Sequence, residues 1–137
     1  GKIVSLDMAE REWCTDEQDY KRIVVGASST TDGKANTDKV MARSDSEAYP
    51  AFVWRRDKGE DWYLPARDEL ESIYAAKEKI NVTLERLKMA VIIEKWYWSS
   101  TEIDDLCVRV VIMYNGFTSS SFNKSFSDYH VRAVSAF

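Results

Sequence analysis

The sequence contains 137 residues, of which 45% are hydrophobic and 31% are charged, and it carries a net charge of −4. This length and composition predict one globular domain over residues 1–137. The negative charge argues against a nucleic-acid-binding protein, because such proteins neutralise phosphates with Lys and Arg. No apolar run approaches the roughly 20 residues that span a bilayer, so we do not expect this domain to insert into a membrane.

The beginning of the chain predicts short strands followed by a polar loop. Lys2–Leu6 alternates apolar and polar side chains and predicts an opening strand, and a second short strand is expected near Trp13. Residues 26–33 combine glycines with Ser, Thr and Asp, whose side chains bond their own backbone. This segment therefore predicts a loop.

The middle of the chain predicts helices. Asn36 or Thr37 is expected to cap a short helix. A second helix is expected over residues 50–58, with Pro at its start, basic residues in its last turn and Gly just beyond. The clearest helix covers Ala66–Leu87, with Leu and Ile on one face and a break into two pieces at Asn81.

The last third of the chain predicts strands. Aromatic and β-branched residues predict strands at 96–98 and 108–114, and the Asn-Gly pair at 115–116 predicts a hairpin with a type I′ turn. Two more short strands are expected near 119–122 and 131–134. A strand, then helices, then several strands without βαβ alternation predicts the α+β class.

The segment Ile103–His130 differs in composition from the rest of the chain. Only Met113 and Lys124 belong to the types Lys, Glu, Gln, Met and Trp, which are common elsewhere in the sequence. Ser, Phe, Tyr, Asp, Asn, Val and Ile dominate instead. Aromatic rings offer rigid contact area, and Ser and Asn offer adaptable hydrogen bonds, a combination typical of recognition surfaces. We therefore expect this segment to display a binding surface.

Three blocks carry a family resemblance: GEDWYLPARDEL at 59–70, WYWSSTE at 96–102 and VRAV at 131–134. Together with Lys2–Asp7 and residues 29–33, they resemble bacterial C-type-lectin-like surface domains of the kind that form the C-terminal part of the collagen-like Lcl adhesins. The resemblance implies the C-type lectin fold, an α+β domain with two helices packed on a small twisted antiparallel sheet and with neighbouring termini. It also implies that this chain is the C-terminal part of a longer surface protein.

The same resemblance extends to the variable proteins of diversity-generating retroelements. In those proteins, adenine-directed mutagenesis rewrites a C-terminal stretch while the flanking framework stays fixed. Randomised adenines in an AAC codon never yield Lys, Glu, Gln, Met or Trp, the types nearly missing from Ile103–His130. Exposed strands also favour Ser, Phe and Tyr in ordinary proteins, so both origins of this composition stay open.

The expected function is non-enzymatic ligand binding by an adhesin domain on a bacterial surface or a phage particle. The aromatic contacts are assigned to Tyr114, Phe117, Phe122, Phe126 and Tyr129. The polar contacts are assigned to Ser119, Ser121, Ser125, Ser127, Asp128 and His130. The expected ligand is a protein or a surface glycan, bound without a cofactor through shape and hydrogen bonds. The alternative is a structural or assembly module of a surface appendage or cell envelope, and the oligomeric state stays open.

Catalysis is not expected. Ser99–Thr101 offers hydroxyl groups, but the single histidine, His130, lies in another strand or loop and no other base is evident. Formylglycine-generating oxidases, which share the fold implied by the resemblance, need a reactive cysteine pair or copper-binding thiols. Cys14 and Cys107 lie far apart in sequence, and whether they form a disulfide or remain thiols stays open.

Three further features have structural interpretations. Glu102, Asp104 and Asp105 offer oxygen ligands suited to calcium, but the calcium-binding sequences of animal lectins are absent, so no metal is expected. At least two rings of Trp96–Trp98 are expected in the core. Arg132 is flanked by apolar residues and predicts a buried ion pair.

Overall fold

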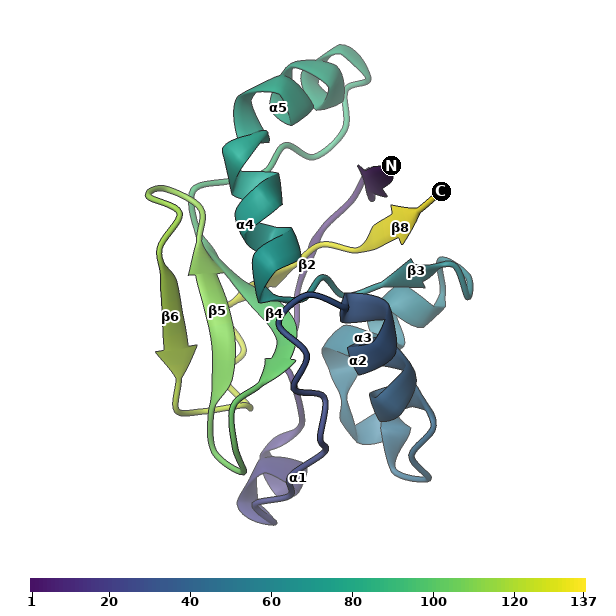
Figure 1. Cartoon of the computed structure of the whole chain (residues 1–137), viewed down its shortest axis with the longest axis vertical. Helices are drawn as coiled ribbons and strands as arrows, with labels where there is room; N and C mark the ends of the chain where they lie inside the picture. The colour runs from purple at the N-terminus through teal and green to yellow at the C-terminus, as the bar shows by residue number, and fades with distance from the viewer.

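Two β-sheets and five α-helices form the structure, a computed structural model that describes residues 1–137 throughout (Figure 1). The helices are α1 (Asp16–Tyr20), α2 (Gly33–Met41), α3 (Pro50–Arg56), α4 (Arg67–Ala75) and α5 (Lys77–Arg86), with a short 3-10 helix η1 (Ser46–Ala48). The strands are β1 (Lys2–Val4), β2 (Ala9–Glu10), β3 (Trp62–Tyr63), β4 (Trp96–Glu102), β5 (Val108–Ile112), β6 (Thr118–Ser121), β7 (His130–Val131) and β8 (Val134–Ala136). The predicted α+β class is confirmed.

The larger sheet has the strand order β2-β7-β4-β5-β6, and the smaller sheet has the order β1-β8-β3. All pairings are antiparallel except that between β4 and β7, where Tyr97 lies opposite His130. The register of β4 and β5 shifts between Trp98 and Glu102. Strand β6 is an edge of the larger sheet and β1 is an edge of the smaller one. Each sheet therefore presents a strand that has no neighbour on one side.

Alternation along β4 and β5 divides the core into two clusters, because successive side chains of a strand point to opposite faces. Trp98 and Val110 belong to the cluster that contains Trp13 and residues of α2 and α3. Tyr97 and Val111 belong to the second cluster, which α4 completes. The rings of Tyr97 and Trp98 are almost fully buried, which confirms the prediction that at least two rings of this block lie in the core.

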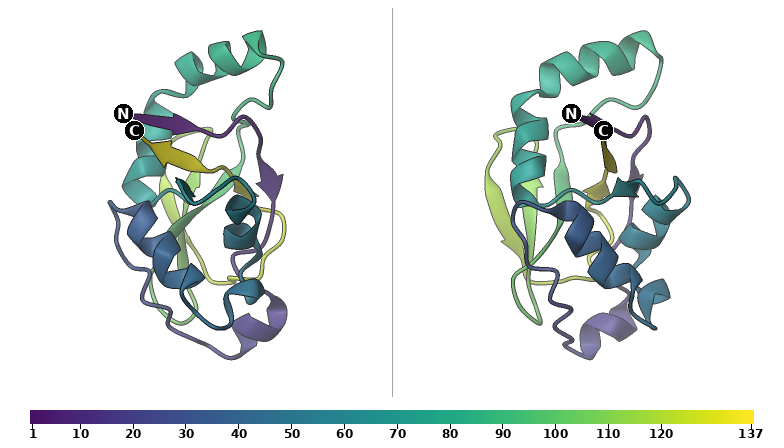
Figure 2. Two further views of the ribbon diagram at one scale, coloured as in Figure 1. Left: turned by 90° about the vertical axis from the view of Figure 1, so that its right-hand side faces the viewer. Right: turned by 45° about the vertical axis from the view of Figure 1, so that its right-hand side comes forward.

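Helix α4 lies beside the central strands, α2 and α3 pack next to each other, and α5 projects beyond the sheets (Figures 1 and 2). The two chain ends lie side by side (Figure 2). The ammonium group of Gly1 donates to the carbonyl oxygen of Phe137 at 2.9 Å, and the Phe137 amide donates back to the Gly1 carbonyl at 2.9 Å.

One buried carboxylate joins four elements. Glu69, in the first turn of α4, accepts hydrogen bonds from the backbone N–H groups of Gly33 at 2.7 Å and Ala66 at 3.1 Å. Its second oxygen accepts from the Tyr63 hydroxyl at 2.7 Å and the Lys2 ammonium at 2.8 Å. The carboxylate therefore satisfies backbone donors at the starts of α2 and α4 and fixes both helices to the smaller sheet.

The helices differ in detail from the predictions. There are five α-helices, whereas the sequence patterns predicted three, the last of them in two pieces, and the resemblance implied two. Helix α2 begins at Gly33, with the Asp32 carboxylate accepting from the Ala35 amide at 2.9 Å. The prediction that Asn36 or Thr37 caps this helix is wrong. Both residues lie inside the helix and are buried. Their polar side chains have hydrogen-bond partners there, because Asn36 donates to the Ser29 carbonyl and Thr37 accepts from the Leu64 amide.

The predicted break in the long helix is also misplaced. The chain bends at Ala76, between α4 and α5, and not at Asn81. The Asn81 amide group exchanges two hydrogen bonds with the backbone of Ile92, at 2.7 and 3.0 Å, and so fastens α5 to the segment that follows it. The strand expected near Trp13 lies earlier, at Ala9–Glu10, where it pairs with β7, and Trp13 itself lies in the core with its ring fully buried.

The Asn-Gly pair turns the predicted hairpin, but not through a type I′ turn. Ile112 bonds to Phe117 across a loop of four residues, and the Ile112 carbonyl accepts from the Gly116 amide at 2.8 Å. Gly116 has a φ of +78°, whereas Asn115 has no positive φ, which a type I′ turn would require. The Asn115 side chain instead accepts from the Phe117 amide at 2.9 Å.

Candidate functional site

Exposed aromatic rings gather where the sequence predicted a binding surface. Tyr114 and Phe117 lie in the β5–β6 turn, Phe122 follows β6 directly, and Phe126 lies in the loop that leads to β7. Their exposed fractions are 52%, 70%, 69% and 37%. We refer to these four residues as the aromatic face. Phe117 precedes β6 and Phe122 follows it, so exposed rings lie at both ends of this edge strand.

The hairpin that holds this face is anchored from beneath. Residues of β5 pair with β6 from Val111 opposite Thr118 to Val108 opposite Ser121. The β5 valines are fully buried, whereas the first three residues of β6 are only half-buried. In the turn, a side chain at Gly116 would collide with the Tyr74 ring at 2.6 Å. The turn thus packs tightly on α4 and leaves the neighbouring Phe117 ring outside.

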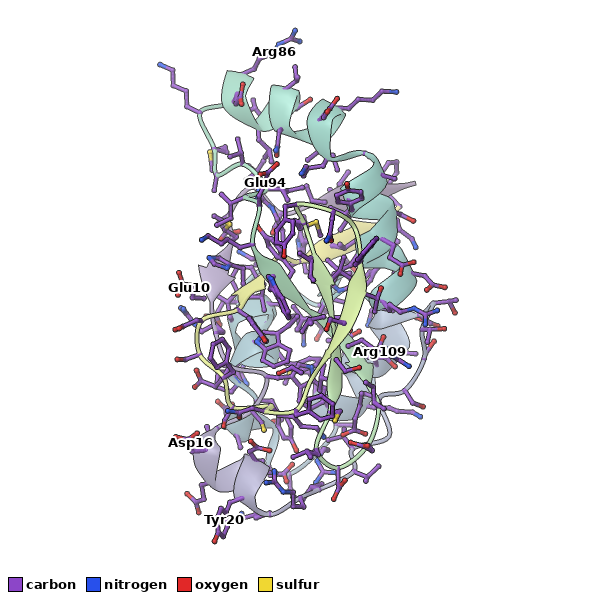
Figure 3. The ribbon with its side chains drawn as sticks, turned by 90° about the vertical axis from the view of Figure 1, so that its left-hand side faces the viewer. Glu10, Asp16, Tyr20, Arg86, Glu94 and Arg109 are labelled. Atoms are coloured by element: carbon purple, nitrogen blue, oxygen red, sulfur yellow. The ribbon has the colours of Figure 1, made fainter.

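A second aromatic group supports the loop before β7. The Tyr129 ring stacks on Trp96 at a centroid distance of 5.6 Å, meets Trp98 edge-on at 4.8 Å and lies 4.5 Å from Phe126. The rings of Trp96, Phe126 and Tyr129 line a shallow hollow of about 280 Å³ together with Lys95 and Asp128. Tyr129 therefore connects the aromatic face to the core. Figure 3 shows the crowding of side chains on this side of the larger sheet.

A buried ion pair fixes the same loop. The Lys124 ammonium lies 2.7 Å from a carboxylate oxygen of Glu102, and both side chains are at most 3% exposed. The ammonium also lies 5.1 Å from the centre of the Trp13 ring. Glu102 further accepts from the amides of Val25 at 3.0 Å and Gly26 at 2.8 Å. The pair ties the loop after β6 to the end of β4 and to the loop before α2.

The sequence did not predict this pair, although one signal was available. Lys124 is the one Lys in Ile103–His130, a segment otherwise without that residue type. The other exception, Met113, is also buried, at 1% exposure. Both exceptional residues therefore belong to the interior and not to the surface of the segment.

The structure places most of the predicted contact residues at or near the surface. Ser127 and Asp128 are exposed, and Ser119, Ser125 and Tyr129 are half-buried. The assignment of Ser121 and His130 as polar contacts is wrong, because these residues are 5% and 7% exposed and cannot contribute to an open ligand face.

Sheet pairing explains why these two side chains are covered. Ser121 lies opposite Val108 at the buried end of β6, and its hydroxyl donates to the Asn123 carbonyl. His130 lies in β7 beside Tyr97, with its Nε2 atom 3.3 Å from the Glu10 carboxylate.

The hydroxyl groups of Ser99–Thr101 have structural partners. The Ser99 hydroxyl donates to the Arg109 carbonyl at 2.7 Å, and the Thr101 hydroxyl donates to the Ser29 carbonyl at 2.8 Å. The Ser100 hydroxyl accepts from the Asn36 amide at 3.2 Å. All three side chains are buried, and they join β4 to β5, to α2 and to the loop before α2, respectively for Ser99, Ser100 and Thr101.

The prediction of a buried ion pair at Arg132 is wrong. The side chain is 1% exposed, but its guanidinium donates to the backbone carbonyls of Ser5 at 2.9 Å and Ala90 at 2.6 Å. Burial lowers the pKa of this guanidinium. Arg132 thus joins the chain after β1 to the segment after α5 through backbone acceptors.

The acidic residues after β4 have roles in the fold. Glu102 pairs with Lys124, and the Asp104 carboxylate accepts from the amides of Leu106 at 2.9 Å and Cys107 at 2.7 Å. These amides lower the pKa of Asp104. The structure holds no cluster of three or more His, Cys, Asp or Glu side chains suited to a metal ion.

Both cysteines are buried free thiols. Burial raises the pKa of the Cys14 thiol to about 12, and burial also raises the pKa of Cys107. Because the thiolate is the reactive form, both groups are poor nucleophiles in the folded protein.

Comparisons with known proteins identify a fold relative. No family model and no curated protein matches the chain. A crystallised fimbrial protein from Bacteroides ovatus ATCC 8483 is similar in structure, with a TM-score of 0.70 and 17% sequence identity. The match covers 100% of this chain and 36% of that chain. No helix here combines the length and the apolar character that crossing a membrane requires. At this identity the likeness is one of fold.

Proposed function

We propose that this chain is a non-enzymatic domain of a bacterial surface appendage. The observation that carries the proposal is the fold likeness, along the entire chain, to part of a fimbrial protein. A match to 36% of that chain is what one domain of a larger appendage protein would give. The aromatic face supports the proposal, because aromatic residues are enriched where subunits meet.

Within this proposal, we assign the scaffold to the C-type-lectin-like type. The three sequence blocks of the resemblance form one framework: 59–70 contains β3 and the start of α4, 96–102 is β4, and 131–134 connects β7 to β8. The side-by-side termini agree with the same assignment.

A second candidate function is recognition of a protein or surface glycan by the aromatic face. The observation that favours it is the burial of Met113 and Lys124, at 1% and 2% exposure. Every solvent-exposed position of Ile103–His130 therefore carries a residue type that adenine mutagenesis of AAC codons can produce. This pattern supports a diversified surface on a fixed framework.

Localisation tests the appendage proposal. Immunogold labelling of the natural, full-length protein should mark filaments or the cell surface, and mechanical shearing should release it with the appendage fraction. Label confined to the cytoplasm would overturn the proposal.

Two measurements test the recognition proposal. Beads coated with the domain should adhere to a target surface or glycan array, and a Phe117→Ser/Phe122→Ser variant should lose this adhesion. Tyr20→Ser is the matched control, because Tyr20 is 88% exposed on α1, outside the aromatic face. Equal adhesion of both variants would exclude the aromatic face.

The encoding locus tests the proposed origin of the surface. A retroelement should carry a near-identical template repeat with adenines at the codons of the aromatic face and none that alter Met113 or Lys124. A locus without such a repeat and without a reverse transcriptase would exclude the retroelement origin, and the composition of Ile103–His130 would then reflect ordinary selection on an exposed surface.

A further inference from the structure

An apolar groove of about 700 Å³ lies between β1 and α5. Its apolar lining includes Ile3, Val4, Leu6, Ile80, Leu84 and Leu87. Ile3 is 49% exposed and Leu87 is 55% exposed, so both walls of the groove are open to solvent. The volume falls within the range of roughly 300–1,000 Å³ that is typical of ligand sites.

One wall of this groove is the free edge of a β-sheet. Strand β1 pairs with β8 on one side only, and Figure 2 shows α5 beyond its other side. The ladder bonds to β8 involve Gly1, which accepts from Phe137, and Ser5, which donates to Ala133. Because alternate residues of an antiparallel strand face the partner, Lys2 and Val4 direct their N–H and C=O groups away from β8.

The groove therefore combines two features that fit one kind of occupant. The outward-pointing backbone groups of this exposed strand match a partner that has its own N–H and C=O groups at the spacing of a strand. The apolar walls require apolar side chains on that partner. An alkyl chain could fill the apolar space but could not pair with the backbone of β1.

Charge defines the occupant further. Lys2 and Glu69 are the charged residues that line the groove, and they pair with each other at 2.8 Å. The lining is thus electrically neutral, and a charged side chain placed between Val4 and Leu84 would lose its hydration without gaining a partner. The matching segment is uncharged in its centre.

We propose that this groove binds an extended, uncharged segment of another polypeptide chain. The segment adds to β1 as a fourth strand of the smaller sheet and buries alternate apolar side chains against α5, the mode of recognition known as β-augmentation. This assignment is independent of the aromatic face and of its ligand, because β1 and α5 contribute nothing to that face.

A synthetic peptide tests the assignment. The probe is a blocked, fluorescein-labelled peptide of about seven residues that alternates valine and threonine, and its control carries proline at the centre. Fluorescence anisotropy should show saturable binding of the first peptide and none of the second. Amide exchange should slow at Lys2 and Val4 when the first peptide binds.

Two variants, one at the residue that caps the C-terminal end of α5 and one within α5, provide the matched pair. Leu87→Glu places a charge on the groove and should weaken binding about tenfold or more. Val82→Glu changes a residue of α5 that is 48% exposed but outside the groove, and it should leave binding unchanged.

Four outcomes would overturn the assignment. They are no saturable binding up to about 1 mM, equal binding of the proline control, equal effects of the two α5 variants, and occupation of the groove by decanoate but not by the peptide. The last result would make the groove a site for aliphatic chains.

Discussion

Removing the buried ammonium of Lys124 should destabilise the domain strongly. In Lys124→Met, the Glu102 carboxylate stays in an environment where its side chain is 2% exposed and loses a partner at 2.7 Å. Removing one partner of a buried ion pair costs about 3–5 kcal/mol, because the remaining charge is left without compensation. The amides of Val25 and Gly26 still donate to Glu102, so we expect a value near the lower end, about 3 kcal/mol.

Urea unfolding measures this loss. With an m-value of about 2 kcal/mol per M, the midpoint should fall by about 1.5 M. Lys34→Met is the control, because Lys34 and Asp38 form an ion pair at 2.7 Å with side chains 46% and 61% exposed. Exposed pairs contribute about 0–1 kcal/mol.

A double variant separates the ion pair from the packing around it. Lys124→Met/Glu102→Gln removes both charges and keeps an acceptor for the Gly26 amide, so it should be more stable than Lys124→Met alone. If Lys124→Met unfolds at the same urea concentration as Lys34→Met, the buried pair does not hold the loop and this reasoning is wrong.

Three further predictions concern single positions. Gly33→Ala should cost about 1–3 kcal/mol in urea unfolding, because its Cβ would lie 2.4 Å from the Leu64 carbonyl oxygen; an unchanged midpoint would contradict this contact. Phe117→Ser should change the free energy of unfolding by less than about 0.5 kcal/mol, and a larger loss would place its ring in the core. For Cys14, burial holds the folded pKa at about 12 against an ordinary 9.0, so the unfolded thiol ionises first. The free energy of unfolding relative to Cys14→Ala should be constant below pH 9, fall by about 1.4 kcal/mol per pH unit above it and level off above about pH 12; parallel curves throughout would refute this burial effect.

Local patterns in the sequence predicted much of the fold. Pro50 opens α3, and the β-branched run of β5 with the following Asn-Gly pair forms a hairpin. These signals act through neighbouring residues, because proline restricts its own φ and a turn needs only a few positions. The predicted burial of Tyr97 and Trp98 also followed from residue type.

Features that depend on distant partners were not predictable in the same way. Ser121 and His130 read as contact residues by type, but their burial depends on which strands cover them. Arg132 was rightly placed in the interior, yet its acceptors are the carbonyls of Ser5 and Ala90, which no local pattern reveals. Any buried backbone carbonyl can replace a carboxylate as the partner of a guanidinium.

Strand β6 lacks the charged side chains that usually protect the edge of a sheet. Natural sheet edges are usually protected by Lys or other charged side chains, which prevent pairing with other chains. Strand β6 reads Thr-Ser-Ser-Ser and is flanked by Phe117 and Phe122, so it has no charge at its edge and an exposed ring at each end. The outer side of β6 is therefore open to pairing with another chain. The codon mechanism of the proposed retroelement origin excludes Lys and Glu but still produces Asp and Arg, so the uncharged edge of β6 does not separate that origin from ordinary surface selection, and the template repeat at the encoding locus is the observation that does.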